Sequence, residues 1–149
     1  MHLRAALENR STMETLPHID EHAVPTHQPP EAVWRSLVRS LGTTMKGART
    51  FGRLLGVVPG DPSPAFEGRV GQTITGFRVV AAEPDHSLVL EGRHRFSRYR
   101  LSFQIRPGLL VARTDAAFPG IGRLYRAAVI GTGAHRLITK GMLRRIARG

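Results

Sequence analysis

The clearest structural signal in the chain is RYRLSFQIR, residues 98 to 106. Its hydrophobic residues Tyr99, Leu101, Phe103 and Ile105 alternate with arginine, serine and glutamine, and no position breaks the alternation. A period of two belongs to an extended chain whose successive side chains point to opposite faces. Because one face is apolar and the other polar, the stretch predicts a strand of an antiparallel sheet with one face on the core and one in water.

Similar segments lie on both sides of this stretch and are joined by short turns. Residues 73–82 and 87–96 precede it, and the proline, aspartate and histidine at 84–86 predict a turn between them. Residues 109–118 follow it after a proline and a glycine. Four consecutive strands with short turns form an antiparallel meander. A further strand is predicted over residues 17–25, which a proline closes.

Two segments show the helical period of about 3.6 residues. The first starts at the proline pair 29–30, whose fixed φ suits a first helical turn, and Gly42 is predicted to end it. The second is the tail of the chain, which the Gly-Thr-Gly segment at 131–133 is predicted to kink or divide. A weaker helical pattern over residues 43–58 contains three glycines, so it predicts either a broken helix or a lid.

The order of these elements, a strand, a helix, a meander and a terminal helix, resembles that of the START-like (SRPBCC) superfamily, which includes polyketide cyclases and lipid-transfer proteins. The most recognisable local mark is PPEAVWRSL, residues 29–37. The tail also looks like a bacterial branch of that superfamily. The residues that carry this second mark are Gly122, Arg123, Leu124, Tyr125 and Arg126, then His135, Arg136, Leu137 and Ile138, then Gly141, Met142 and Leu143.

The resemblance implies an α+β protein with the helix-grip fold, in which a curved antiparallel sheet wraps around a long C-terminal helix, with smaller N-terminal helices. We expect residues 16–149 to form one such domain and residues 1–15 to be a flexible extension. Members of the superfamily usually have more strands than the five predicted here. The missing strands would fall within residues 51–70, unless that region is a lid.

The same fold places a cavity between the concave face of the sheet and the last helix. If alternation assigns the faces, several apolar and a few polar side chains line this cavity, as is usual for small-ligand sites. Small residues in the last strand leave volume for a ligand, although these side chains would also serve as an ordinary packed core. The candidate ligand-binding residues are Trp34, Phe77, Leu90, His94, Tyr99, Phe103, Thr114, Phe118 and His135.

Three of these residues could contribute chemistry as well as shape. His94 and His135 fall on predicted buried faces, where an imidazole can act as a general base or as a hydrogen-bond partner near neutral pH. Tyr99 could donate to a ligand carbonyl. Each could equally be a satisfied core residue. The sequence therefore predicts binding of a small hydrophobic ligand such as a lipid or a polyketide, with cyclase-type activity left open.

Charge suggests an alternative function. The net charge is +11, and beyond Glu91 there are thirteen lysines and arginines against one acid, Asp115. A basic surface over residues 136–148, with the arginine row at 93, 95, 98, 100 and 106, could bind nucleic acid or anionic membrane. Because twenty of the 22 basic residues are arginine, codon usage in a GC-rich genome would also account for the excess without any such partner.

Several classes of function are excluded by what the sequence lacks. With no cysteine there is no disulfide, no thiolate nucleophile and no cysteine-based metal site. The histidines show no HExxH spacing, so we expect no metal and no cofactor. No apolar run approaches the length of about 18 residues that a membrane span needs. We expect a cytoplasmic protein that is a monomer or a homodimer.

Overall fold

The computed structural model describes residues 16–44, 62–94, 97–117 and 134–149, with the backbone alone at residues 44, 94 and 134–139. In chain order, its elements are β1 (His18–Pro25), α2 (Pro30–Thr44), β2 (Thr73–Ile74), β3 (Phe77–Glu83), β4 (Ser87–His94), β5 (Ser97–Arg106), β6 (Leu109–Ala117) and α5 (Ala134–Arg148). The described part of the chain is thus an α+β structure, as the sequence predicts.

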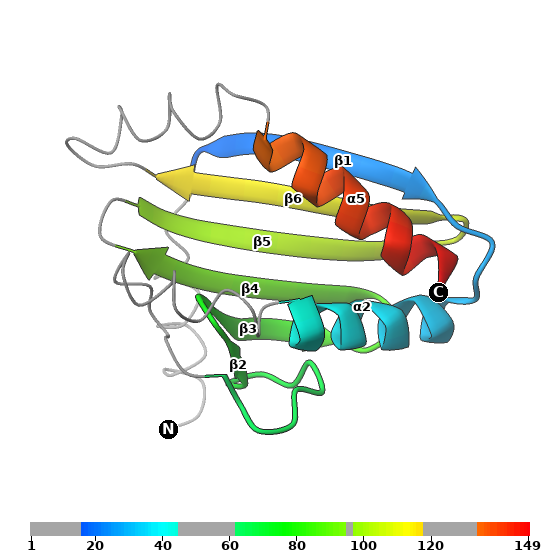
Figure 1. Ribbon diagram of the computed structural model, residues 1–149, viewed down its shortest axis with the longest axis horizontal. Coiled ribbons are helices and arrows are strands. Elements are labelled where there is room, and N and C mark those ends of the chain that lie inside the picture. The colour runs from blue at the N-terminus through cyan, green and yellow to red at the C-terminus, as the bar shows by residue number, and fades with distance from the viewer. Residues whose placement is uncertain (1–15, 45–61, 95–96, 118–133) are drawn as a thin grey trace, which may run out of the picture.

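The strands form one antiparallel sheet in the order β1-β6-β5-β4-β3-β2. The strands from β3 to β6 are the predicted meander, and β1 joins it along the free edge of β6. Both described helices lie on the same face of this curved sheet (Figure 1). We call that face the inner face and the opposite one the outer face.

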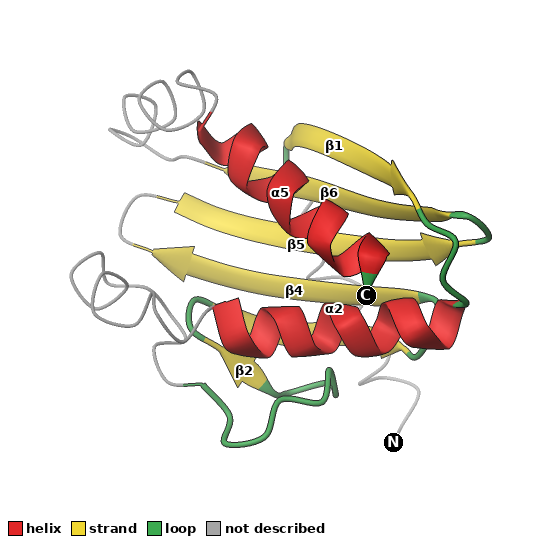
Figure 2. Ribbon diagram, turned by 45° about the vertical axis from the view of Figure 1, so that its right-hand side comes forward, coloured by secondary structure: helices red, strands yellow, loops and turns green. Residues whose placement is uncertain are grey.

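The two helices cover different parts of the inner face. Helix α2 runs nearly along the strands beside β3 and β4, whereas α5 crosses β6 and β5 obliquely (Figure 2). The two helices also contact each other, and α5 contacts β1. A C-terminal helix lying across a curved antiparallel sheet is the arrangement that the helix-grip prediction requires. None of the described helices is both long enough and apolar enough to span a membrane.

The hydrophobic core lies where the helices meet the inner face. Rows of paired residues run across the sheet, and in one of them Phe103 stands between Leu88 on β4 and Ala112 on β6. All three are essentially inaccessible to solvent. The helices contribute Val33, Leu37 and Leu41 from α2 and Leu143, Ile146 and Ala147 from α5 to the same core.

The connection between β1 and α2 is tied to the end of the chain. The hydroxyl of Thr26 donates to the carbonyl oxygen of Ala147 at 2.9 Å, and the amide of Gln28 donates back to the same hydroxyl at 3.1 Å. The carbonyl of Ala147 is one of those that a helix leaves without an internal partner at its C-terminus. This buried link therefore holds the last turn of α5 against the entry to α2.

Two predicted boundaries are wrong. Helix α2 continues through Gly42 to Thr44, the last residue described in this segment, and a Cβ atom at position 42 would lie 3.6 Å from Cβ of Phe66. The strand predicted over residues 73–82 is divided by a turn at Gly76, whose φ of 86° is open mainly to glycine. The two-residue strand β2 is therefore the additional strand of the sheet.

Other predictions concern residues that lie wholly or partly outside the described ranges. The extension over 1–15 and the break at 131–133 lie there entirely, as does most of the weak helical pattern over 43–58. Of the region 51–70, the described part begins at residue 62 and contains no strand. The additional strand thus follows this region and does not lie in its described part.

Candidate functional site

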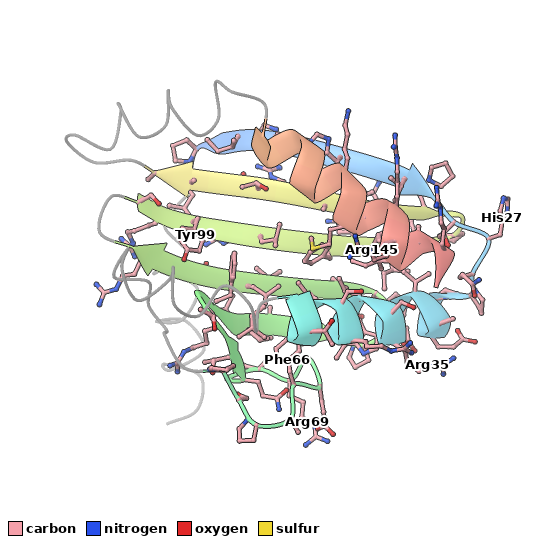
Figure 3. The ribbon with its side chains drawn as sticks, in the orientation of Figure 1. His27, Arg35, Phe66, Arg69, Tyr99 and Arg145 are labelled. Atoms are coloured by element: carbon pink, nitrogen blue, oxygen red, sulfur yellow. The ribbon has the colours of Figure 1, made fainter. Side chains whose placement is uncertain are left out.

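The inner face of the sheet has two parts that differ in exposure. Under the helices its side chains are fully buried, as Leu88, Leu90 and Phe103 illustrate. Toward the start of β5 and the end of β6, four inward-facing side chains remain part-exposed. We call this second part the open end, defined by Phe77, Tyr99, Leu101 and Thr114. Tyr99 lies on a region of the sheet that neither described helix crosses (Figure 3).

The turn between β2 and β3 bounds the open end on one side. The hydroxyl of Tyr99 donates to the carbonyl oxygen of Gly76 in this turn at 2.8 Å. The rings of Phe77 and Tyr99 meet edge to face with centroids 5.0 Å apart, a favourable aromatic geometry. Tyr99 therefore links the middle of the sheet to the turn at its edge.

Gly92 allows that turn to come so close. It lies directly opposite Tyr99 on the neighbouring strand β4. A Cβ atom at position 92 would collide with the carbonyl oxygen of Gly76 and would lie 2.7 Å from Cε2 of Tyr99. Only glycine leaves room for the backbone of the turn to pass over β4 at this point.

Strand β1 adds a polar pair to the inner face. Nε2 of His22 lies 3.2 Å from Oδ2 of Asp20, and the two side chains are only 11% and 8% exposed. Burying a carboxylate is costly unless it is hydrogen-bonded, so the imidazole compensates part of that cost. We call these two residues the Asp20–His22 pair. Among the described residues, no group of three or more histidine, aspartate or glutamate side chains could hold a metal ion.

A β-bulge gives the pair its orientation. The register between β1 and β6 shifts between His18 and Asp20, so these residues do not share a face as two positions two apart normally would. On the outer face, Nδ1 of His18 lies 3.5 Å from Oδ1 of Asp115. Asp20 instead points inward and lies opposite Thr114. The next inward residue, His22, faces Ala112, one row from Thr114 toward the packed part of the inner face.

The structure places five of the predicted site residues on the inner face. Phe77, Tyr99 and Thr114 belong to the open end, whereas Leu90 and Phe103 are fully buried in the core. The sequence pattern assigned the face correctly, but it could not separate these two groups. Burial depends on which part of the face a helix covers, and alternation carries no information about that.

Trp34 has a different setting from the strand residues. It is a part-buried residue of α2 that packs against the core, and its indole lies beside Gly68 in the segment before β2. The side chains of His94 and His135 lie outside the described residues, although their backbones end β4 and begin α5 respectively. Phe118 lies outside the described residues as well.

Sequence reasoning missed the Asp20–His22 pair. Residues 18–25 read HIDEHAVP, in which the inward positions 20 and 22 are polar and only Val24 is apolar. A strand whose inner face is polar lacks the apolar alternation that would have marked it. The bulge adds a second difficulty, because counting by twos from His18 places Asp20 with His18 on one face.

The outer face carries charges that are balanced locally. Nε of Arg100 donates to Glu91 at 2.7 Å, and Nε of Arg113 donates to Asp115 at 2.9 Å. A groove of about 610 Å³ runs over this face, lined by three arginines and three acids among other residues. Its lining is Glu21, Val80, Ala81, Val89, Glu91, Arg100, Ser102, Gln104, Arg106, Val111, Arg113 and Asp115.

The exposed face of α5 is basic. Arg144, Arg145 and Arg148 surround a shallow hollow of about 420 Å³ together with Gly141 and Gly149, and Arg145 can be seen on this helix in Figure 3. Of the arginine row proposed for an anionic partner, Arg100 is paired with an acid, and Arg95 lies outside the described residues.

The chain matches no family model and no curated protein. Among solved structures it is similar to the Mll3558 protein from Rhizobium loti, with a TM-score of 0.51 and 18% identity over 90% of this chain and 96% of that one. At this identity the similarity concerns the fold, and it agrees with an α+β domain whose helices cover one face of an antiparallel sheet.

Two further structures match less well. MLL2253 from Mesorhizobium loti has a TM-score of 0.48 at 16% identity, covering 85% of this chain and 95% of that one. DynU16, a protein in the dynemicin biosynthetic locus, has a TM-score of 0.38 at 14% identity, covering 85% of this chain and 45% of that one.

Proposed function

We propose that this protein binds a small, mainly apolar ligand on the inner face of its sheet, at the open end. The observation that carries the proposal is the division of the inner face. Phe77, Tyr99, Leu101 and Thr114 keep part of their surface accessible, although they point to the same side as the core. A mostly apolar surface with a few polar groups is the usual lining of a small-ligand site.

The resemblance to the START-like superfamily supports the same proposal. Its local mark, residues 29–37, begins α2, and its helix-grip arrangement agrees with the observed sheet and C-terminal helix. That superfamily contains carriers as well as cyclases, and a fold alone does not choose between them. Cyclase-type activity is the finer form of the proposal, and Asp20, His22 and Tyr99 are the groups on the described inner face with a proton to give or accept.

Binding on the inner face is favoured over an anionic partner on the basic surface. Nucleic acid and anionic membrane require positive charge that is free to meet phosphate. In the outer groove, Arg100 is paired with Glu91 and Arg113 with Asp115, so these two arginines are already neutralised by neighbouring acids. The exposed arginines of α5 remain, but the hollow that they line is shallow and open.

A pair of neighbouring substitutions tests the proposal. Leu101 and Ser102 are adjacent on β5, but Leu101 faces the open end and Ser102 lines the outer groove. Leu101→Trp fills the open end, and Ser102→Trp adds the same bulk on the other face. We expect Leu101→Trp to weaken binding of the apolar fluorophore N-phenyl-1-naphthylamine about tenfold or more, equivalent to ~1.4 kcal/mol, and Ser102→Trp to leave it within about twofold.

Circular dichroism and thermal melting establish that both variants are folded before binding is compared. Equal weakening by the two variants, or no binding to the unsubstituted protein, would contradict a ligand site on the inner face. Native mass spectrometry of the protein purified from its host gives an independent measurement, because a resident ligand adds a discrete mass that Leu101→Trp should reduce.

A further inference from the structure

The Asp20–His22 pair occupies a place where an apolar pair would stabilise the fold at least as well. Both side chains are close to nine-tenths buried on a face whose other residues are mainly hydrophobic. Replacing buried polar pairs by apolar residues of similar volume is often neutral or stabilising. Stability alone therefore does not explain why this pair is polar.

The geometry of the pair assigns a role to each imidazole nitrogen. An ionised carboxylate only accepts hydrogen bonds, so Nε2 of His22 must carry the hydrogen that it shares with Oδ2 of Asp20. In the neutral ring, Nδ1 is then an acceptor. No described residue donates to Nδ1. Asp20 thus holds the ring in the tautomer that offers an acceptor to a ligand.

Thr114 supplies a complementary group next to the pair. It lies directly opposite Asp20 and diagonally to His22, at a separation of roughly 7 Å between backbones, which a ligand functional group can bridge. Its part-buried hydroxyl makes no hydrogen bond with the described residues and is free to donate or accept. Beyond Thr114, the row continues to Leu101, which is apolar.

From these groups we propose that His22, oriented by Asp20, is the hydrogen-bond anchor for a hydroxyl group of the ligand. The ligand class is an aromatic or alicyclic molecule with one hydroxyl at its edge. The hydroxyl donates to Nδ1 of His22, Thr114 hydrogen-bonds the same oxygen or a neighbouring one, and the apolar body lies on Leu101 and Tyr99. This inference rests on the proposed function, because it assumes that the ligand occupies the open end.

The test compares three probes of the same shape. 2-Naphthol carries a hydroxyl donor, 2-methoxynaphthalene carries only an acceptor, and 2-methylnaphthalene carries neither. We expect the unsubstituted protein to bind 2-naphthol roughly five- to tenfold more tightly than the other two, because one hydrogen bond to a buried acceptor distinguishes them. Isothermal titration calorimetry or competition with N-phenyl-1-naphthylamine measures the three affinities.

Histidine substitutions on the two faces of β1 provide a matched control. His22→Leu removes the acceptor on the inner face and should weaken 2-naphthol alone, leaving at most the about two- to threefold preference that Thr114 supplies. His18→Leu makes the same change on the outer face, where the imidazole meets Asp115, and should leave the preference intact. Thr114→Val should reduce the preference by a smaller factor, about two- to threefold.

Asp20 is a positioning residue in this proposal, so its test reads the tautomer directly. Nitrogen-15 NMR of the unsubstituted protein should show Nε2 of His22 protonated and Nδ1 unprotonated at a pH where the ring is neutral. Asp20→Asn should change that distribution and lower the preference for 2-naphthol without abolishing binding of 2-methylnaphthalene. A role of Asp20 in folding alone would leave the tautomer unchanged.

The outcomes separate this inference from the function on which it rests. If all three probes bind equally well, or if His22→Leu retains the full preference, the anchor is wrong while the apolar site stands. If none of the probes binds, the apolar site and the anchor both fail. Should His22→Leu not fold, the preference of the unsubstituted protein and its nitrogen-15 spectrum still decide the question.

Discussion

Two parts of one sheet face, built from the same strands with the same alternation, have different surroundings. At the packed part, Leu88 and Phe103 are fully enclosed between sheet and helices. At the open end, Tyr99 and Thr114 point to the same side but keep accessible surface. Alternation therefore predicts the side to which a residue points, whereas the path of α2 and α5 determines how deeply it is buried. We expect the functional site where residues point to the inner face but are not covered by a helix.

The strongest test of this division uses two leucines in one row. Leu90 and Leu101 are direct partners on β4 and β5, and only Leu90 is fully buried. Leu90→Ala leaves a cavity in a closed core and should lower the free energy of unfolding by about 4 kcal/mol. Leu101→Ala removes a side chain that already meets solvent and should cost about half as much. Chemical denaturation measures both.

Similar losses for the two leucines would contradict the division, because they would mean that the open end is as closed as the core. A larger loss of unfolding free energy for Leu101→Ala than for Leu90→Ala would mean that the packed part and the open end have been assigned the wrong way round. Slopes of the denaturation curves should be equal in both variants, which establishes that the difference arises in the folded state.

The second test concerns the turn that bounds the open end. Gly92→Ala places a methyl group against the backbone of Gly76, which cannot move as a flexible side chain would. We expect a loss of about 2–3 kcal/mol, typical of forced overpacking. Gly141→Ala on α5 is the control, since nothing lies within 4 Å of a Cβ there, and alanine should stabilise the helix by up to about 1 kcal/mol.

Thermal melts of the two glycine variants should therefore move in opposite directions. Near-ultraviolet circular dichroism should also change in Gly92→Ala, because the shifted turn alters the packing of Tyr99. An unperturbed Gly92→Ala protein would mean that the turn does not pass over β4.

The sequence predicted the fold further than it predicted the site. Residues 98–106 and their neighbours carry a period of two, and local periodicity is enough to define the meander and its inner face. The Asp20–His22 pair escaped prediction because polar residues on an inner face, together with a bulge, are not periodic. The turn at Gly76 was also not predicted, because the hydrogen bond that holds it comes from Tyr99, which is distant in the sequence.

The smallest effect is expected at the hydroxyl of Tyr99. Tyr99→Phe keeps the edge-to-face contact with Phe77 but removes the hydrogen bond to Gly76, so stability should fall by about 1 kcal/mol. Because the turn is then held less firmly, hydrogen exchange at Thr75 and Phe77 should accelerate more than exchange in the core at Phe103. If the acceleration were uniform, Tyr99 would stabilise the whole sheet equally, and the open end would not be bounded by a separately held turn.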